Sequence, residues 1–182
     1  MEIPLDGCRL RSWKRADEAS LVLHANNRNV WINLRDRFPH PYGRSDARAW
    51  LAHAAVQKPE TNFAIDVGGE AVGGIGFHVQ EDVHRRSAEI GYWLGEPFWG
   101  RGFATQAVRA LTAYAFRAHD LVRIYACVFE WNPASGRVLE KAGFVREGRL
   151  RRSVTKDGRT IDQFLYAILR DPAEASGGGE TP

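Results

Sequence analysis

The most constraining feature of the sequence is a pair of glycines, Gly100 and Gly102, directly before a stretch with helical periodicity. Small and apolar residues recur at helical spacing over about 103–118. The first four amides of a helix have no partner within the helix, and the helix dipole adds partial positive charge there. This arrangement predicts an anion site, most often one for phosphate or pyrophosphate.

Three known binding patterns share part of this segment, and each departs from it. A nucleotide P-loop needs Gly-x-x-x-x-Gly-Lys-Ser/Thr, and neither the lysine nor the hydroxyl is at the required place. A dinucleotide-binding turn needs a third glycine, where this chain has Thr105. Arg101–Ala104 matches the start of an RNA-recognition strand, but the residues after it have helical rather than strand periodicity. We therefore expect no direct nucleic-acid binding.

The composition is typical of one soluble domain. The 182 residues are 44% hydrophobic and 26% charged, which suffices for a single ordinary core. No stretch approaches the ~18 apolar residues of a membrane span, and the first residues lack a signal-peptide pattern. We predict a cytoplasmic protein with one domain over 1–172 and a disordered tail over 173–182. The cysteines and histidines show no ligand spacing, so no metal is expected.

Periodicity and turn residues divide the chain into strands and helices. Strands are predicted at 8–13, 62–67, 71–79, 86–94, 122–129, 144–152 and 160–169. Helices are predicted at 17–26 and 29–34, from an N-cap at Ser45, at 103–118, and from Asn132-Pro133 to Gly143. The order predicts an α/β fold with a mixed, mostly antiparallel central sheet of about seven strands. Parallel pairing is expected only across the last two helices.

Four short segments carry a family resemblance when they are taken together. They are Ala88-Glu-Ile-Gly-Tyr-Trp-Leu94, Trp99-Gly-Arg-Gly-Phe-Ala-Thr105, Asn132-Pro-Ala-Ser135 and Val138-Leu-Glu-Lys-Ala-Gly-Phe144. This combination resembles the GNAT superfamily of acetyl-CoA-dependent N-acetyltransferases, and it is most similar to the branch that acetylates the N-terminal amines of ribosomal proteins. With the strand order, the resemblance covers about residues 8 to 170. It implies a GNAT-like sheet that is splayed in the middle and flanked by helices.

The resemblance also implies where acetyl-CoA binds. The cofactor would wedge between the strand ending at Leu94 and the strand 122–129, taking strand-edge hydrogen bonds from Trp93 and Leu94. The family usually has Gln or Arg where this chain has Trp99, so we expect backbone amides rather than that side chain to hold the phosphates. The amides expected to cradle the pyrophosphate are those from Arg101 through Gly102, Phe103 and Ala104 to Thr105.

Amine acetylation needs a base for the incoming ammonium and a proton for the departing thiolate. Glu89 is the candidate base, because strand alternation places it on one face with small Gly91, which leaves room for an acceptor. An ion pair with a nearby cation explains Glu89 equally well. Asn132 fits as the cap of the following helix, and the resemblance adds a contact to the cofactor arm. The resemblance makes Ser135 the general acid, with a helix-surface serine as the alternative.

The expected function is transfer of acetyl from acetyl-CoA to a primary amine by direct attack in a ternary complex. The expected acceptor is a protein N-terminal α-amine. The alternatives are an acetyltransferase for a small amine (amino acid, polyamine or aminoglycoside) and a non-catalytic acetyl-CoA sensor. Tyr92, Tyr114 and Tyr166 are alternative acids, and the loop Phe38–Tyr42 lies where the family builds its acceptor site. Both a monomer and a homodimer are compatible with the sequence.

Overall fold

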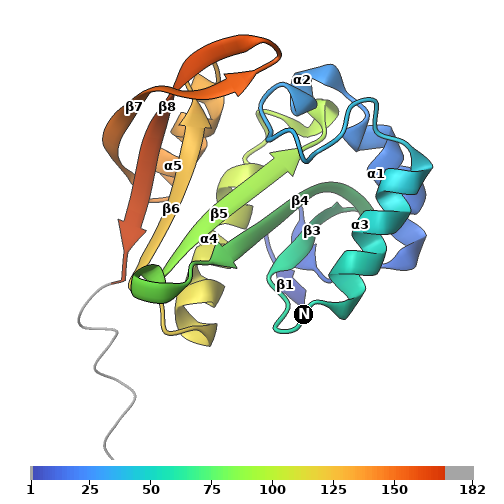
Figure 1. Ribbon diagram of the computed structural model, residues 1–182. Helices are drawn as coiled ribbons and strands as arrows, with labels where there is room; N and C mark the ends of the chain where they lie inside the picture. Colours follow the sequence, from blue (N-terminus) through green and yellow to red (C-terminus); the bar gives the residue numbers. More distant parts are fainter. Residues whose placement is uncertain (1, 171–182) are drawn as a thin grey trace, which may run out of the picture.

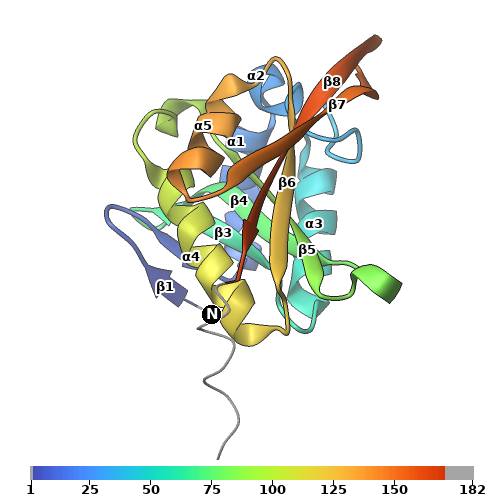
Figure 2. The same ribbon diagram turned by 90° about the vertical axis from the view of Figure 1, so that its left-hand side faces the viewer.

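The computed structural model places residues 2–170 around one eight-stranded sheet with helices on both faces (Figures 1 and 2). The tail predicted at 173–182 lies outside the described residues. The strand order across the sheet is β1-β2-β3-β4-β5-β6-β8-β7. The strands are β1 (Glu2–Pro4), β2 (Arg9–Arg11), β3 (Asn62–Val67), β4 (Glu70–Val79), β5 (Ser87–Leu94), β6 (Arg123–Phe129), β7 (Val145–Lys156) and β8 (Arg159–Leu169). The helices are α1 (Glu18–Ala25), α2 (Arg28–Trp31), α3 (Arg44–Val56), α4 (Phe103–Ala118) and α5 (Pro133–Lys141).

The mixed, mostly antiparallel sheet is confirmed, with two differences from the sequence prediction. The structure has an eighth strand, β1, which the pattern missed because it is only three residues long and ends at Pro4. Within residues 2–170 the only parallel pair is β5–β6, across α4. Parallel pairing across α5 was wrong, because β8 lies between β6 and β7 and pairs antiparallel with both. The arginine-rich strand β7 takes the exposed edge, where charged side chains stay solvated.

The sheet splays between β5 and β6. The two strands pair only where Ser87–Glu89 meets Arg123–Tyr125. Beyond these residues they diverge into a V, and α4 crosses behind it (Figure 1). The first half of each strand therefore closes the sheet, and the second half opens it.

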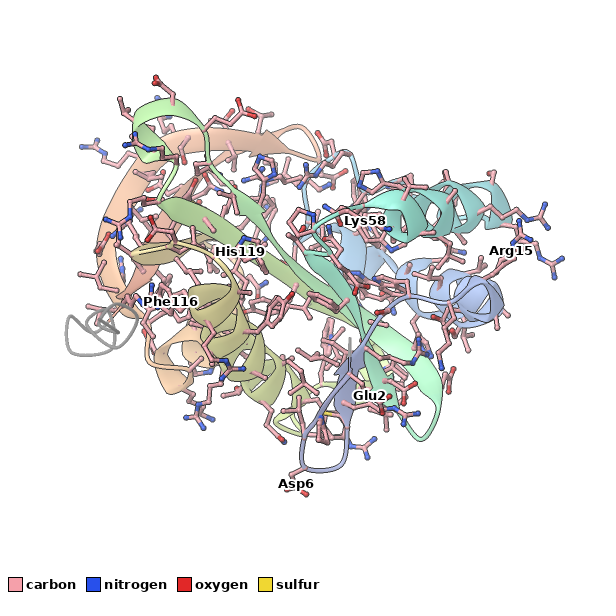
Figure 3. All side chains as sticks on the ribbon, turned by 90° about the horizontal axis from the view of Figure 1, so that it is seen from below. Glu2, Asp6, Arg15, Lys58, Phe116 and His119 are labelled. Carbon is pink, nitrogen blue, oxygen red and sulfur yellow. The ribbon has the colours of Figure 1, made fainter. Side chains whose placement is uncertain are left out.

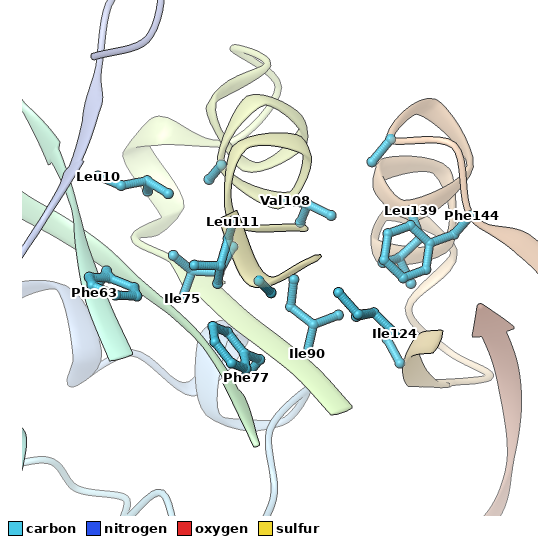
Figure 4. Packing of buried hydrophobic residues seen from close by; sticks show 14 of the residues in the cluster. Leu10, Phe63, Ile75, Phe77, Ile90, Val108, Leu111, Ile124, Leu139 and Phe144 are labelled. Carbon is cyan, nitrogen blue, oxygen red and sulfur yellow. The ribbon is translucent and has the colours of Figure 1, made fainter. Parts of the chain in front are cut away.

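The main core lies between the sheet and α4. Ala107, Val108 and Leu111 of α4 are fully buried against β-sheet residues that include Phe63 and Ile90 (Figure 4). Each large apolar side chain buried in this way contributes roughly 1.5–3 kcal/mol. A second, smaller cluster lies on the opposite face, under α1 and α3. Its buried members are Leu21, Ala25, Tyr42, Ala47 and Leu51.

Helix ends follow the predicted capping with one correction. Asn132 caps α5 as expected, since its side chain accepts a hydrogen bond from the Ser135 N–H at 3.2 Å. Gly143 follows α5 with φ +97°, as a C′ glycine does. The N-cap of α3 is Gly43 rather than Ser45. Asp46 makes this earlier start favourable, because its carboxylate accepts from the Gly43 N–H at 2.8 Å.

A buried ion network joins the N-terminal strands to α1. The Arg11 guanidinium donates to both carboxylate oxygens of Asp17 at 2.8 Å and to Asp66 at 2.6 Å. All three side chains are buried. The turn between β1 and β2, with Asp6 at its tip in Figure 3, is tied to α4 through the side-chain amide of Gln106. These contacts tie the β1–β2 edge of the sheet to α1 on one face and to α4 on the other.

Candidate active site

A cavity of about 1570 Å³ occupies the splay and reaches both faces of the sheet. Its size exceeds the roughly 300–1,000 Å³ of a pocket for one small ligand, so it has room for two reactants at once. One side is formed by β5, β6 and the N-terminal ends of α4 and α5. The other side is formed by α3 and by residues 29–39.

The N-terminus of α4 is open toward this cavity. Gly100 and Gly102 have φ of +75° and +83°, a backbone conformation that favours glycine. A Cβ atom at either position would meet nothing within 4 Å, so space lies above both. No side chain caps the helix, and its first internal hydrogen bond is from the Gln106 N–H to the Gly102 carbonyl at 3.1 Å. The preceding amides of Phe103–Thr105 are therefore available to an anion.

The side chains of Trp99 and Arg101, in the loop before α4, both have partners next to the loop. The Arg101 guanidinium lies over the rings of Phe98 and Phe103, 5.6 Å and 4.8 Å from their centroids. The Trp99 indole donates from Nε1 to the Leu94 carbonyl at 2.7 Å and closes the loop onto the end of β5. Arg101 thus does not line the cavity, and Trp99, which does, has its indole N–H already bonded.

Three cations that were not predicted as site residues line the cavity near α4 and α5. They are Arg109 on α4 and Arg137 and Lys141 on α5. The Arg109 guanidinium also donates to the Lys141 carbonyl, which ties the two helices together. A sequence signal exists for two of them, because residues 137 and 141 are four apart and share one helix face. Their charge adds to the anion preference of the α4 N-terminus.

The backbone groups of β5 alternate between its two neighbours. The Gly95 N–H, just after β5, donates to the Val72 carbonyl of β4 at 2.8 Å, so odd-numbered residues direct their groups toward β4. The Val122 N–H, just before β6, donates to the Arg86 carbonyl at 2.9 Å, so even-numbered residues direct theirs toward β6. Beyond the last paired residues, the even-numbered groups point into the splay.

This alternation changes one predicted contact. Tyr92 and Leu94 direct their backbone groups into the splay, whereas those of Trp93 are directed to β4. The Leu94 carbonyl already accepts from the Trp99 indole, which leaves its N–H for a ligand. The backbone groups of Trp93 are therefore taken up by β4, whereas those of Tyr92 and the Leu94 N–H face the splay, and a cofactor contact there stays a prediction.

On the α5 side of the splay, Tyr92 and Ser135 form a hydroxyl pair. Their oxygens are 2.8 Å apart, and the Tyr92 hydroxyl is also 3.1 Å from the Ser135 carbonyl. Burial raises the pKa of Tyr92 to about 12, against the opposing effect of its hydrogen bond with Ser135. Tyr92 is therefore a protonated donor at neutral pH. Of the other two candidate tyrosines, Tyr114 packs on Phe77, and Tyr166 lies beside Gly136 with its hydroxyl bonded to Glu140 at 3.4 Å.

On the opposite face, Glu89 is ion-paired with Arg35. The arginine comes from the segment after α2, 54 residues earlier, and donates to the Glu89 carboxylate. Glu89 lies directly across from His78 on β4, and its side chain is 21% exposed. A Cβ atom at Gly91 would meet nothing within 4 Å, so the predicted space beside Glu89 is present. Glu89 is thus both a cation partner and a carboxylate facing the cavity.

Among residues 2–170 no group of histidine, cysteine and acidic side chains is arranged to hold a metal ion. No helix in this described part of the chain is long and apolar enough to cross a membrane. The polar groups of the cavity include the amides and cations near α4 and α5, the hydroxyl pair, and the Glu89–Arg35 pair.

A family model described as an acetyltransferase (GNAT) domain matches residues 8–145. The chain belongs to this family. Among curated relatives, it is 43% identical over 101 residues to the uncharacterized N-acetyltransferase YoaA of Bacillus subtilis. It is 37% identical over 102 residues to the putative ribosomal N-acetyltransferase YdaF of the same organism. These matches cover 56% of this chain and 55–56% of the relatives, so the chain spans about half the length of the curated relatives it matches.

Solved structures of this family match over nearly the full chain. Mycobacterium smegmatis RimJ in complex with CoA-disulfide is 28% identical with a TM-score of 0.77, covering 93% of this chain and 84% of that one. A spermidine N-acetyltransferase from Vibrio cholerae in complex with CoA and spermine is 26% identical with a TM-score of 0.75, covering 91% and 96%. The splayed GNAT fold described above is therefore that of the family.

Proposed function

We propose that this protein transfers an acetyl group from acetyl-CoA to a primary amine by direct attack in a ternary complex. The observation that carries the proposal is the cavity through the splay, with an anion cradle on one side and a carboxylate on the other. We call the first side the donor wall (residues 92–109 and 132–141) and the second the acceptor wall (residues 33–39, His78, Glu89 and Gly91).

The donor wall fits acetyl-CoA in shape and charge. Open space above Gly100 and Gly102 allows a pyrophosphate to reach the amides of Phe103–Thr105. Arg109, together with Arg137 and Lys141 on α5, adds cationic groups for the phosphates. When bound, acetyl-CoA supplies an acyl thioester. The family resemblance gives Asn132 a contact to the cofactor arm, in addition to its cap of α5.

On the acceptor wall, Glu89 acts as the base. An α-ammonium group bound beside Gly91 gives a proton to the Glu89 carboxylate, directly or through a water, and the neutral amine is then the nucleophile. The Arg35 guanidinium holds the Glu89 carboxylate in place beside that position.

On the donor wall, Ser135 acts as the general acid. Its Oγ gives a proton to the departing sulfur, and the Tyr92 hydroxyl, 2.8 Å from Oγ, holds the serine side chain in position. The two hydroxyls lie on the face opposite Glu89. Because β5 alternates between Glu89 and Tyr92, base and acid approach the reacting atoms from opposite sides of the sheet.

We propose a protein N-terminal α-amine as the acceptor. The similarity to a putative ribosomal N-acetyltransferase supports this choice, and so does the charge of the acceptor wall, which carries Arg35 and Arg37. A polyamine is the second candidate, because a structural relative is a spermidine N-acetyltransferase. The two arginines disfavour a polycation by like-charge repulsion.

A two-step experiment tests this function. Acetyl-CoA should raise the melting temperature, and free thiol should then appear with N-terminal peptides as acceptors, with the acetylated product identified by mass. No stabilisation by acetyl-CoA would overturn the proposal. Stabilisation without thiol release, for peptides and for small amines alike, would identify a non-catalytic sensor instead.

A further inference from the structure

The charge of the cavity is uneven, and this bears on the acceptor. Its lining contains two acids, Asp46 and Glu89, against five arginines and lysines. Three of these cations, on α4 and α5, belong to the donor wall. The other two, Arg35 and Arg37, lie on the segment that covers the acceptor wall. Asp46 is already engaged, because its carboxylate accepts from the N-cap amide of α3. On the acceptor side, the two arginines therefore lie with Glu89 around the space for the acceptor, while Asp46 is held at the start of α3.

Arg35 has donors to spare. A guanidinium carries five N–H donors in a planar fork. In the part of the chain that the structure describes, its hydrogen-bond partner is Glu89, contacted by one terminal nitrogen. The Arg35 side chain is 56% exposed and lines the cavity. The rest of the fork therefore faces the space where the acceptor binds.

The segment around Arg35 is held in place from both ends. The neighbouring Asp36 accepts from Lys156 at the β7–β8 turn at 2.8 Å. That lysine side chain is only 2% exposed, and its Nζ lies 3.7 Å from the ring centroid of Trp31. On the other end, the Phe38 ring packs against Trp93 with centroids 5.7 Å apart. Arg35 is thus presented by an anchored segment that bridges the opening of the V, which favours specific recognition over a mobile surface charge.

We propose that Arg35 recognises a carboxylate on the acceptor, so that the preferred substrates are N-terminal peptides with an acidic residue within their first two positions. This inference rests on the proposed function. An amine bound to Glu89 is two hydrogen bonds, or about 6 Å, from the Arg35 guanidinium. A side-chain carboxylate on the first or second acceptor residue spans that distance. It pairs with the unused part of the fork, while Glu89 keeps its contact to the amine.

The test compares acceptor peptides within each enzyme variant. Three peptides, beginning Ala-Glu, Ala-Gln and Ala-Lys and otherwise identical, are assayed for kcat/KM. The wild type should prefer the Glu peptide over the Gln peptide by about tenfold, the size of one hydrogen bond between charged groups. The Lys peptide should be the poorest. In Arg35→Gln the Glu/Gln ratio should fall to near one, and Arg35→Glu should turn the preference toward the Lys peptide.

Arg48→Gln is the matched control, because Arg48 is an exposed arginine on α3 paired with Glu18 and does not line the cavity. It should keep the wild-type ratio. A wild-type ratio near one, or a ratio unchanged in Arg35→Gln, would overturn the inference while acetylation itself continues. If none of the peptides is acetylated, the proposed function fails together with this inference. Acetyl-CoA stabilisation of each variant verifies that it is folded.

Discussion

The donor wall is built from residues that are close in sequence, whereas the acceptor wall is assembled from segments far apart. Gly100–Thr105 and Asn132–Ser135 present amides and a hydroxyl through local helix starts. Arg35 and Glu89 come from elements 54 residues apart, and the segment of Arg35 is held by Lys156 from the far end of the chain. A local site tolerates changes elsewhere in the sequence, while an assembled site can vary one segment at a time. This difference explains how one fold keeps its donor and changes its acceptor.

The largest expected effect is a loss of kcat when the carboxylate of the acceptor wall is removed. Glu89→Gln should lower kcat by about 10²- to 10⁴-fold, the usual contribution of a general base. The affinity for acetyl-CoA should be unchanged, because Glu89 faces away from the donor wall. Steady-state kinetics and calorimetry measure the two quantities. Glu18→Gln, which also loses an arginine partner, is the control. A kcat within about threefold of wild type would remove Glu89 from the mechanism.

A substitution in the donor wall should instead weaken the binding of acetyl-CoA. Gly102→Val should weaken acetyl-CoA binding by about 100-fold, because a branched side chain fills the open space and is strained at φ +83°. Gly69→Val tests strain alone, since Gly69 also has positive φ and open space but lies outside the cavity. Calorimetric titration and melting temperature compare them. Equal acetyl-CoA affinity in both variants would contradict an amide cradle at Gly102.

The hydroxyl pair should give an intermediate effect confined to the chemical step. Tyr92→Phe should lower kcat about tenfold with little change in acetyl-CoA affinity, because the hydrogen bond at 2.8 Å to Ser135 is lost. Ser135→Ala should lower kcat further, and the double variant should add little to it. Tyr114→Phe, a change in the core, is the control.

The pH dependence provides a second test of this pair. Tyr92 acts protonated, and burial raises its pKa to about 12, so wild-type kcat should show no loss near pH 10, where an ordinary tyrosine ionises. A tyrosine-like decline in kcat at pH 10 that is absent in Tyr92→Phe would show that the hydroxyl ionises as in water.

A smaller effect should follow when the segment that carries Arg35 loses its contact with Lys156. Asp36→Asn removes the charge partner of Lys156 next to Arg35, and we expect about a threefold rise in the acceptor KM without change in acetyl-CoA affinity. Asp157→Asn breaks the exposed pair with Arg28 at the same turn and serves as the comparison. If both variants raise the acceptor KM equally, the turn as a whole rather than Asp36 holds the segment.

The smallest expected effect at neutral pH concerns the buried ion network of Arg11, Asp17 and Asp66. Burial opposes ionisation of Asp66, but hydrogen bonds from Arg11 and from the Gly69 N–H hold its pKa below the usual value. A lowered folded-state pKa stabilises the protein above the unfolded-state pKa, near 4, and this stability is lost as the pH falls through the folded-state value. Acid unfolding should therefore steepen below about pH 4, and Asp66→Asn should flatten it. If Asp66→Asn loses stability at low pH as steeply as the wild type does, this network is not the cause of the acid unfolding.

Local pattern was sufficient for most of the donor wall. Glycines at positive φ, an Asn-Pro helix start and a helical stripe are short-range signals, and the structure has α4 at 103–118 and Asn132 as an N-cap, as predicted. Alternation along β5 also placed Glu89 and Gly91 on one face, and in the structure Tyr92 packs on the other, against the core. The backbone groups of β5 alternate as well, and those of Trp93 bond β4 rather than face the splay. The sequence could not show this, because it depends on which residues of β4 pair with β5.

The sequence by itself therefore determined the family, through four short segments taken together, and the order of elements from β2 onward, because each of these signals lies within one helix, strand or turn. Only the tertiary structure decided that Arg35 pairs with Glu89, that Tyr92 meets Ser135, and that β8 lies between β6 and β7. These pairings join residues 43 to 54 positions apart, or strands whose order reverses at the sheet edge. No local preference encodes them, since they result from how the sheet splays and which apolar faces bury one another.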